Sequence, residues 1–224
     1  MSKICSIICG APDGSLPEKP EGLIICADKG LDHALAAGLT PDMIVGDFDS
    51  ANSKPPEGIP VVRTIPEKDD TDTILACEAA IKEGCDEIRL YCALGGRTDH
   101  TIANIQTMEM MRQRGVNVTI VGNGERIYLV HEREAEIPRF RGYVSVFSYG
   151  ETCIVSEYGM KYGLVRYRLD NAYPLGVSNE VADEVGFHNP GHFINLFKRS
   201  LGMTPGMYRS FWGQGQRRKL EGSV

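Results

Sequence analysis

Short apolar runs alternate with helical patterns over the first 125 residues of the chain. The apolar runs are typical of buried strands, and the segments between several of them repeat apolar positions at helical spacing. This alternation predicts a largely parallel sheet with helices on its faces. We expect strands at Ile4–Cys9, Leu23–Ala27, Met43–Val45, Val61–Thr64, Glu87–Ala93 and Asn117–Val121, with helices at Lys29–Ala37, Thr71–Glu83 and His100–Arg114.

The pattern changes at about residue 126, where short β-rich segments are separated by Gly or Asp turns. These segments predict a small antiparallel β-sandwich over residues 126–180. After Glu180 the spacing of apolar residues becomes helical again, at Val181–Val185 and Gly191–Ser200. The predicted fold is therefore an α/β domain at 1–125, a β-sandwich at 126–180 and an atypical helical tail at 181–224. The strands expected in the sandwich are Ile127–His131, Tyr143–Tyr149, Cys153–Ser156, Leu164–Tyr167 and Arg168–Asp170.

Composition narrows the class of protein without changing this picture. The chain has 224 residues, 42% of them hydrophobic and 24% charged, which are ordinary values for a globular protein. It contains no apolar run long enough for a membrane span, and its N-terminus lacks the pattern of a secretory signal. Seven cysteines without a CxxC pair predict reduced, buried thiols. We therefore expect a cytoplasmic protein with no membrane partner.

Charge is distributed unevenly along the chain. Residues 181–224 carry six basic and three acidic side chains, whereas the rest of the chain carries 18 basic and 27 acidic ones. An acidic body followed by a basic tail indicates two origins or two roles.

Aspartates follow several of the predicted strands, and their positions carry the strongest chemical signal. Asp28, Asp47 and Asp49 stand at strand ends, Asp72 opens a helix, and Asp99 follows another strand. Aspartate is also common in turns and at helix N-caps, which explains any one of them. It does not explain the set, because carboxyl ends of parallel strands meet at one edge and clustered carboxylates need a cation. Hard oxygen donors of this kind favour Mg²⁺.

A glycine pair beside these acids supplies complementary chemistry. Gly95 and Gly96 allow close approach of the backbone to a ligand, Arg97 can bind phosphate oxygens, and the next helix offers its N-terminal amides. His100 either binds phosphate or caps that helix. The chain lacks the P-loop, the dinucleotide-binding glycine pattern and the protein-kinase motifs. Residues that bind a metal beside residues that bind phosphate are typical of enzymes that catalyse phosphoryl transfer.

Five motifs together are specific enough to indicate a family. They are ADKGLDH at 27–33, PDMIVGDFDS at 41–50, KDDTD at 68–72, GGRTDH at 95–100 followed by Asn104, and GVSNE at 176–180. In order and spacing they resemble thiamine pyrophosphokinase over residues 3–180. The resemblance implies a homodimer in which each chain has an ATP-binding catalytic domain followed by a thiamine-binding sandwich. It also implies Mg²⁺-dependent transfer of pyrophosphate from ATP to the hydroxyl of thiamine, which yields thiamine diphosphate and AMP.

The same resemblance implies roles for individual residues. Asp47, Asp49 and Asp72 would bind Mg²⁺, while Asp28, Asp72, Arg97 and Asp99 would act around the phosphates and the attacking hydroxyl. The residues implied in substrate binding are Lys68, Asp69, Thr71, His100, Asn104, Ser178 and Asn179. Lys68 and Asp69 would lie near the entry of thiamine, and Ser178 and Asn179 would contact thiamine from the sandwich across the dimer interface.

The tail departs from this family after Glu180. Residues 181–209, with VGF, HF, FKR and GMTP in order, resemble the last part of an AraC-type helix-turn-helix domain whose first half is missing. The tail is either a foreign segment that leaves the sandwich incomplete or a helical extension packed on it. DNA binding by the tail is not expected, because half a module buries few of its aromatic residues and its charge is small. The alternative function is a DNA-binding regulator whose degenerate enzyme body senses thiamine or a nucleotide, and another alcohol acceptor also stays open.

Overall fold

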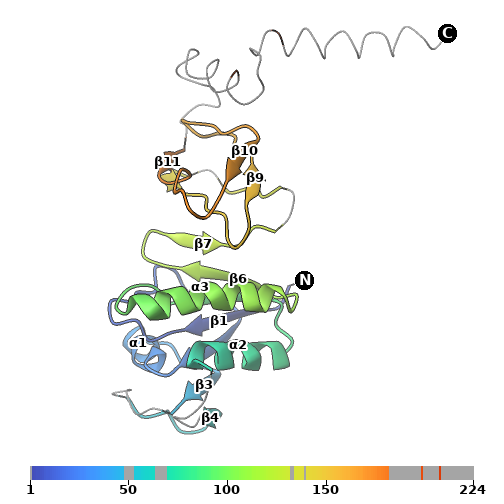
Figure 1. The fold of residues 1–224 in the computed structure, drawn as a ribbon. Helices are drawn as coiled ribbons and strands as arrows, with labels where there is room; N and C mark the ends of the chain where they lie inside the picture. Colours follow the sequence, from blue (N-terminus) through green and yellow to red (C-terminus); the bar gives the residue numbers. More distant parts are fainter. Residues whose placement is uncertain are drawn as a thin grey trace, which may run out of the picture. The chain divides into compact units, whose positions relative to one another are not determined.

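The computed structural model describes residues 2–47, 53–63, 70–131, 134–138 and 140–181, together with Lys198 and Met207. The chain divides into two compact units, Met1–Ala135 and Glu136–Val224. The first unit contains a seven-stranded sheet, with the strands in the order β4-β3-β2-β1-β5-β6-β7 (Figure 1). The strands are β1 (Ile4–Ile8), β2 (Leu23–Ala27), β3 (Met43–Gly46), β4 (Val61–Arg63), β5 (Glu87–Tyr91), β6 (Asn117–Val121) and β7 (Arg126–Tyr128).

All neighbouring strands from β4 across to β6 pair in parallel, and β7 pairs antiparallel with β6. Ile7 in β1 stands opposite Ile25 of β2 on one side and Leu90 of β5 on the other. The strand order reverses at this point, because the chain builds outward from β1 to β4 and then returns to add β5 beside β1. A parallel α/β sheet with such a reversal has its ligand crevice at the carboxyl ends of the two strands concerned.

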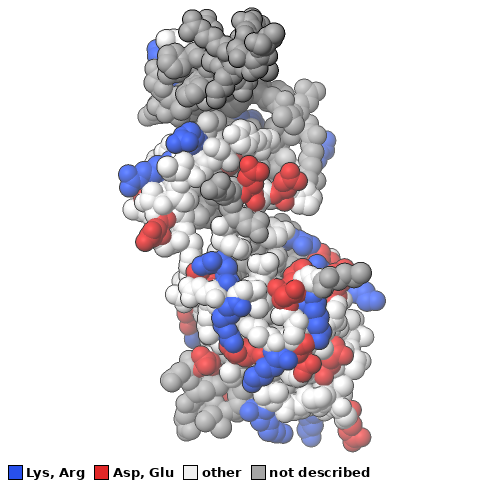
Figure 2. All heavy atoms as spheres, turned by 90° about the vertical axis from the view of Figure 1, so that its right-hand side faces the viewer, with Lys and Arg blue, Asp and Glu red and all other residues white. Residues whose placement is uncertain are grey.

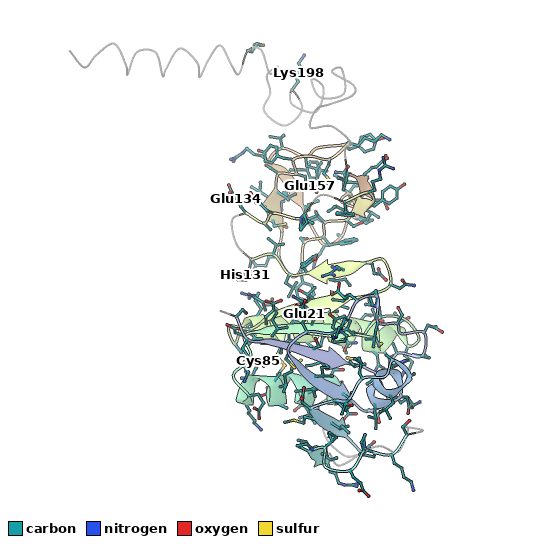
Figure 3. The ribbon with its side chains drawn as sticks, turned by 180° about the vertical axis from the view of Figure 1, so that it is seen from behind. Glu21, Cys85, His131, Glu134, Glu157 and Lys198 are labelled. Carbon is teal, nitrogen blue, oxygen red and sulfur yellow. The ribbon has the colours of Figure 1, made fainter. Side chains whose placement is uncertain are left out.

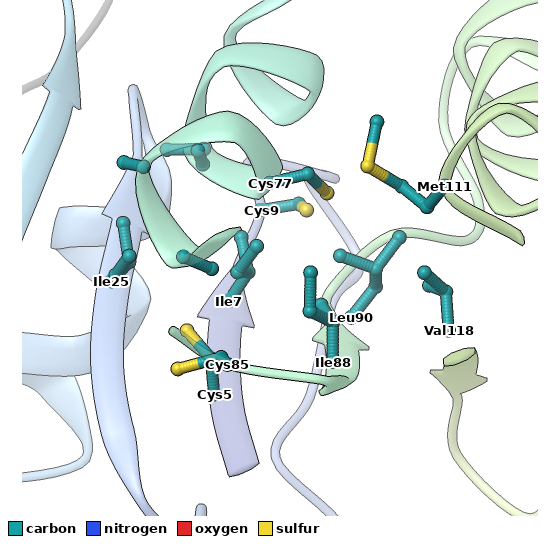
Figure 4. Packing of buried hydrophobic residues seen from close by; sticks show 14 of the residues in the cluster. Cys5, Ile7, Cys9, Ile25, Cys77, Cys85, Ile88, Leu90, Met111 and Val118 are labelled. Carbon is teal, nitrogen blue, oxygen red and sulfur yellow. The ribbon is translucent and has the colours of Figure 1, made fainter. Parts of the chain in front are cut away.

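Helices cover both faces of this sheet because the strands are apolar on both faces. The helices are α1 (Gly30–Ala36), α2 (Asp72–Lys82) and α3 (Thr98–Arg112). Ile7 belongs to a core cluster with Cys77 of α2 and Met111 of α3, shown from close by in Figure 4. The next residue, Ile8, belongs to the other cluster, with Leu31 of α1. Successive residues of a strand point to opposite faces, so α2 and α3 pack on one face and α1 on the other.

The cysteines are free, as predicted, but one of them is not buried. All seven are free, and six are buried, with Cys153 exposed. Burial raises the pKa of Cys9 to about 12 and that of Cys26 to about 12. These thiols therefore stay protonated at neutral pH and serve as small apolar side chains of the core.

The second unit consists, in its described part, of two small antiparallel ladders. Strand β8 (Tyr143–Val144) pairs with β11 (Asn179–Glu180), and β9 (Cys153–Val155) pairs with β10 (Tyr167–Leu169). Within the described residues of this unit, Leu169 is the one hydrophobic side chain that is buried. The ladders are antiparallel, as expected.

Three details of the strand assignment differ from the expectation. Strand β7, assigned from the sequence to the second domain, is instead the last strand of the first sheet, and the two units divide after Ala135. A short hairpin turn after β6 returns the chain to the same sheet, and alternation alone does not say which sheet a strand joins. The two strands expected at Leu164–Tyr167 and Arg168–Asp170 are the single strand β10, and β11 was not expected as a strand.

The segments predicted to be helical in the tail lie outside the described residues, except for Val181, Lys198 and Met207. Within the described residues, none of the helices has the length and the apolar composition needed for a membrane span. Acidic and basic side chains are interspersed over the face of the first unit that Figure 2 shows. The acidic excess of the chain is therefore not gathered in one patch on that face.

Candidate functional site

The carboxyl ends of the parallel strands bring the predicted acidic residues to one edge of the sheet. Asp28 follows β2 and Asp47 follows β3, while Asp72 is the first residue of α2. Helix α2 begins beside the end of β1, because the Cys9 Sγ and Thr73 Oγ1 atoms are 3.7 Å apart. The loop after β5, which carries the glycine pair and Arg97, leaves the same edge. Asp28, Asp47, Asp72 and Arg97 thus come from separate segments at the same edge of the sheet.

Asp28 and Asp47 come from adjacent strand ends that are packed closely together. The Asp28 amide donates to the Val45 carbonyl at 2.8 Å. A Cβ atom on Gly46 would stand 3.1 Å from the Asp28 Cα atom, so glycine is what lets the two chains approach. Asp28 also has a φ of +46°, a conformation that is uncommon for a residue other than glycine. The backbone is held in this strained form at the point where a carboxylate is delivered to the edge.

These carboxylates suit Mg²⁺, whose ligands in proteins are oxygen atoms. Within the described residues, however, no three His, Cys, Asp or Glu side chains are grouped closely enough to hold a metal alone. Asp49, the second acid of the GDFDS motif, lies outside the described residues, as do Lys68 and Asp69. Asp47 and Asp72 are the two predicted metal ligands that the structure describes.

The start of α2 gives its threonine hydroxyl and its aspartate structural roles. Thr71 is the N-cap residue, and its side chain accepts a hydrogen bond from the Ile74 amide at 3.3 Å. Asp72 lies in the first helical turn, where the helix dipole favours a negative charge. The helix therefore stabilises the Asp72 carboxylate, and the Thr71 hydroxyl already has a structural partner.

The loop after β5 carries an ion pair that the sequence did not predict. Arg97 donates to both carboxylate oxygens of Asp99, at 3.1 and 2.5 Å, and both side chains are exposed. The hydrogen bond from Arg97 lowers the pKa of Asp99, and the His100 amide, 3.0 Å from the same carboxylate, acts in the same direction. Asp99 is therefore ionised at neutral pH and a weak proton acceptor. A phosphate held by Arg97 has to share this guanidinium with Asp99.

Asn104, in helix α3, supports the loop that follows β5. Its side chain is buried, and its Nδ2 atom donates to the Ala93 carbonyl at 2.8 Å. Ala93 immediately precedes the segment that leads to Gly95 and Gly96, both of which have positive φ angles. Asn104 thus connects helix α3 to the base of the predicted phosphate loop. Its Nδ2 atom is used in this hydrogen bond within the protein.

The two residues predicted to contact thiamine lie in the second unit, in different environments. Ser178 is exposed, has a φ of +57°, and its amide donates to the Ser145 hydroxyl at 2.9 Å. Asn179 is buried and makes three internal hydrogen bonds: two to Tyr162, at 3.0 and 3.1 Å, and one to Glu157 at 2.7 Å. Asn179 is therefore committed to the structure of its own unit, and Ser178 is the residue presented to solvent.

Glu157, which no sequence pattern singled out, is the partner of Asn179 inside the second unit (Figure 3). It is only 9% exposed, and its Oε1 atom is buried without a hydrogen-bond partner in the described part of the chain. Burial raises the pKa of Glu157, and the hydrogen bond from Asn179 works in the opposite direction. A lone glutamate in a β-rich segment gives no sign of this, because its partner is more than 20 residues away in the sequence.

Comparison with known proteins agrees with the motifs. Residues 18–120 match the family described as thiamin pyrophosphokinase, catalytic domain, and residues 179–210 match the AraC family of bacterial regulatory helix-turn-helix proteins. The thiamine pyrophosphokinase of Bacillus subtilis (strain 168) is 27% identical over 211 residues, which cover 88% of this chain and 99% of that protein. The chain therefore resembles thiamine pyrophosphokinases over its body and AraC-type regulators over part of its tail, as predicted.

Solved structures show the same likeness. The crystal structure of thiamine pyrophosphokinase from Bacillus subtilis has a TM-score of 0.70 and 26% identity, covering 80% of this chain and 90% of that one. Thiamin pyrophosphokinase from Candida albicans has a TM-score of 0.60 and covers 82% of this chain and 84% of that one. At 18% identity, the second likeness shows the fold alone.

The role of Asn104 is testable by its effect on stability. Replacement of Asn104 by Ala leaves the Ala93 carbonyl buried without its donor, which costs about 1 to 3 kcal/mol of unfolding free energy. Urea unfolding followed by circular dichroism measures this loss. Asn117→Ala is the control, because Asn117 is exposed at the start of β6; equal effects of the two changes would contradict the assignment.

The raised pKa of Glu157 predicts a pH dependence with a defined sign. A glutamate whose pKa is higher in the folded state favours folding below its ordinary value of 4.5, and this contribution is lost as the pH rises through the folded-state pKa. Glu157→Gln should therefore reduce the loss of stability between about pH 4 and pH 8. Unfolding of both proteins across this range provides the measurement, with the exposed Glu151→Gln as control; parallel pH profiles would refute the prediction.

Proposed function

We propose that this chain is a thiamine pyrophosphokinase, which transfers pyrophosphate from ATP to the hydroxyl of thiamine and releases AMP. The observation that carries the proposal is the sheet edge at which Asp28, Asp47 and Asp72 meet the glycine–Arg97 loop. The edge belongs to a segment similar to the catalytic domain of that enzyme, and the likeness supports an enzyme of this type. A cytoplasmic location is proposed with it.

Metal binding is assigned to the acids that follow β3 and open α2. Asp47, Asp49 and Asp72 would hold Mg²⁺, with Asp28 beside them. When bound, Mg²⁺ neutralises charge on the triphosphate and on the clustered carboxylates. Strand β3 and helix α2 approach this position from different directions, so the carboxylates arrive already oriented and little ordering is needed when ATP binds.

Phosphate binding is assigned to Arg97 and to the amides at the start of α3. The guanidinium carries five donors, two of which point at Asp99. The remaining donors suit phosphate oxygens, and the Asp99 carboxylate keeps the guanidinium in a fixed direction. His100, next to Asp99 in the first turn of α3, is placed to contact the same phosphates.

We assign the role of orienting the thiamine hydroxyl to Asp72 rather than to Asp99. Transfer needs the hydroxyl in line with the bond between the α- and β-phosphates, and positioning supplies much of the rate. Asp99 is a poor proton acceptor because Arg97 lowers its pKa. Asp72, in the first turn of α2, is proposed to orient the hydroxyl, whose proton leaves as the new phosphate ester bond forms.

Thiamine binding is assigned to the second unit of one protomer and, across the proposed dimer interface, to the segment before α2 of its partner. Ser178 would contact thiamine directly, Asn179 would support it through Glu157 and Tyr162, and Lys68 and Asp69 would lie near the entry. Homodimerisation is proposed as well. Large side chains stay exposed on the second unit, which favours association; they include Tyr143, Phe147, Ile154 and Tyr158.

The proposal predicts that the acids are essential for turnover. Asp47→Asn or Asp72→Asn should lower thiamine-dependent AMP release by at least about 100-fold, because each change removes a charge from a preorganised site. Initial rates at saturating Mg²⁺ provide the measurement. Asp86→Asn is the control, since Asp86 accepts hydrogen bonds from Ser2 and Lys3 near the amino ends of the strands and Asn retains an acceptor oxygen. Near-normal rates for both site variants, or AMP release that ignores thiamine, would refute the proposal.

The match of residues 179–210 to the AraC family favours a second candidate, a DNA-binding regulator that uses the tail. The matched segment is short, and the body of the chain retains its acidic residues, so we expect no specific DNA binding. Fluorescence anisotropy with labelled duplex DNA tests this on the full chain and on a chain ending at Glu180. Binding that weakens with salt and disappears with the tail would instead support the regulator.

A further inference from the structure

An aromatic face runs along the second unit where the chain continues from β8 toward Tyr149. Exposed and half-buried positions alternate from Arg141 to Tyr149, as expected for an extended segment with one side toward solvent. Tyr143 and Phe147 lie on the exposed side, where they are 68% and 64% exposed. Together with Tyr149 they define the aromatic face. Strand β11 runs beside this segment, with Glu180 opposite Tyr143.

An exposed aromatic face is unfavourable in a unit with a small apolar core. In the described part of this unit, Leu169 is the one hydrophobic side chain that is buried. Large apolar side chains gathered on an exposed surface mark places where another segment or molecule packs. We therefore expect a further segment or molecule to cover the aromatic face.

The tail of the chain leaves directly from this face. The Val181 amide donates to the Gly142 carbonyl at 3.0 Å, next to Tyr143. Eleven residues separate Val181 from Phe193, and an extended segment of this length spans up to roughly 40 Å. The second unit extends to Val224, so the tail belongs to it. A segment attached beside the face reaches it at a high effective concentration.

The tail carries apolar side chains that need a partner of the same kind. Phe193, Leu196 and Phe197 stand at positions i, i+3 and i+4, the spacing that places side chains on one face of a helix. Lys198, which is described in this segment, is helical and exposed, as expected for a position beside such an apolar face. The likeness to the AraC family covers residues 179–210, and so short a segment buries few of its aromatic residues by itself.

We propose that residues 187–212 pack on the aromatic face of their own unit. The apolar side chains at positions 193, 196 and 197 then cover Tyr143 and Phe147, as helices with this spacing cover apolar surfaces elsewhere. Both partners remove apolar surface from water, which favours the packed state. A second copy of the chain would also cover this face, but the tail is favoured because it is already attached beside it. Ile154, on β9, stays exposed for association of two copies.

The same packing affects Ser178. Its amide donates to the Ser145 hydroxyl at 2.9 Å, and Ser145 is on the exposed side of the segment that carries the aromatic face. The packed tail therefore competes with thiamine for Ser178, a consequence that rests on the proposed function. The packing itself does not depend on that function.

The fluorescence of Trp212, the single tryptophan of the chain, tests the packing on the full chain. Phe147→Ser and Phe193→Ser should each shift its emission to longer wavelengths. Each should also speed trypsin cleavage after Lys198 about 10-fold or more, because the burial of a phenylalanine side chain stabilises the packed state by at least this factor. The double variant should shift no further, since both changes break one contact surface. Val130→Ser, at an exposed position after β7, is the matched control.

The outcomes separate the packing from the proposed function. Equal emission and cleavage in the wild-type chain and both variants would overturn the packing. A shift to longer wavelengths on dilution would overturn it too, since the tail would then be packed on a second copy. Release of the tail in both variants of a chain that makes no thiamine diphosphate would support the packing and refute the proposed function.

Thiamine itself tests the competition for Ser178. Its addition should shift the Trp212 emission of the wild-type chain toward that of Phe147→Ser. An unchanged emission in a chain that makes thiamine diphosphate would overturn the competition.

Discussion

The common direction of β1 to β6 is the constraint on which the rest of the structure depends. Parallel strands must be buried on both faces, and the apolar runs of β2 and β3 satisfy this requirement, so that Asp28 and Asp47 stand directly after the strand ends. Ile7 and Ile8 pack against opposite helix layers, so the sheet is held rigidly from both sides. Residues that follow the strands are consequently delivered to one edge in fixed positions.

Electrostatics at that edge follow from this geometry. Asp28 and Asp47 are brought together by the close packing of Asp28 against Gly46, and such carboxylates need a compensating cation. In the described part of the chain, Arg97 pairs with Asp99. The helix dipole at the start of α2 stabilises Asp72 without neutralising it. Acidic residues thus accumulate at this edge, and the triphosphate binding that we propose there would need a divalent cation.

The elements of the first unit were predictable because apolar periodicity reports directly on burial, and the acids were predictable because they follow strands. The hydrogen-bond partners of individual side chains could not be predicted in the same way. Asn104 and Asn179 look like binding residues in the sequence, yet their amides hold Ala93 and Glu157, because hydrogen bonds between distant segments leave no local pattern. Strand β7 was assigned to the wrong sheet for a similar reason.

The unequal charge of the two parts of the chain now has a more specific meaning. In the body, acids gather at a sheet edge that we assign to metal and phosphate, whereas the basic tail coincides with a likeness to another family. The most direct test of this account is ³¹P NMR of the products from ATP, thiamine and Mg²⁺. The account predicts AMP and thiamine diphosphate in equal amounts. Formation of ADP with thiamine monophosphate, or of AMP with free pyrophosphate, would contradict it.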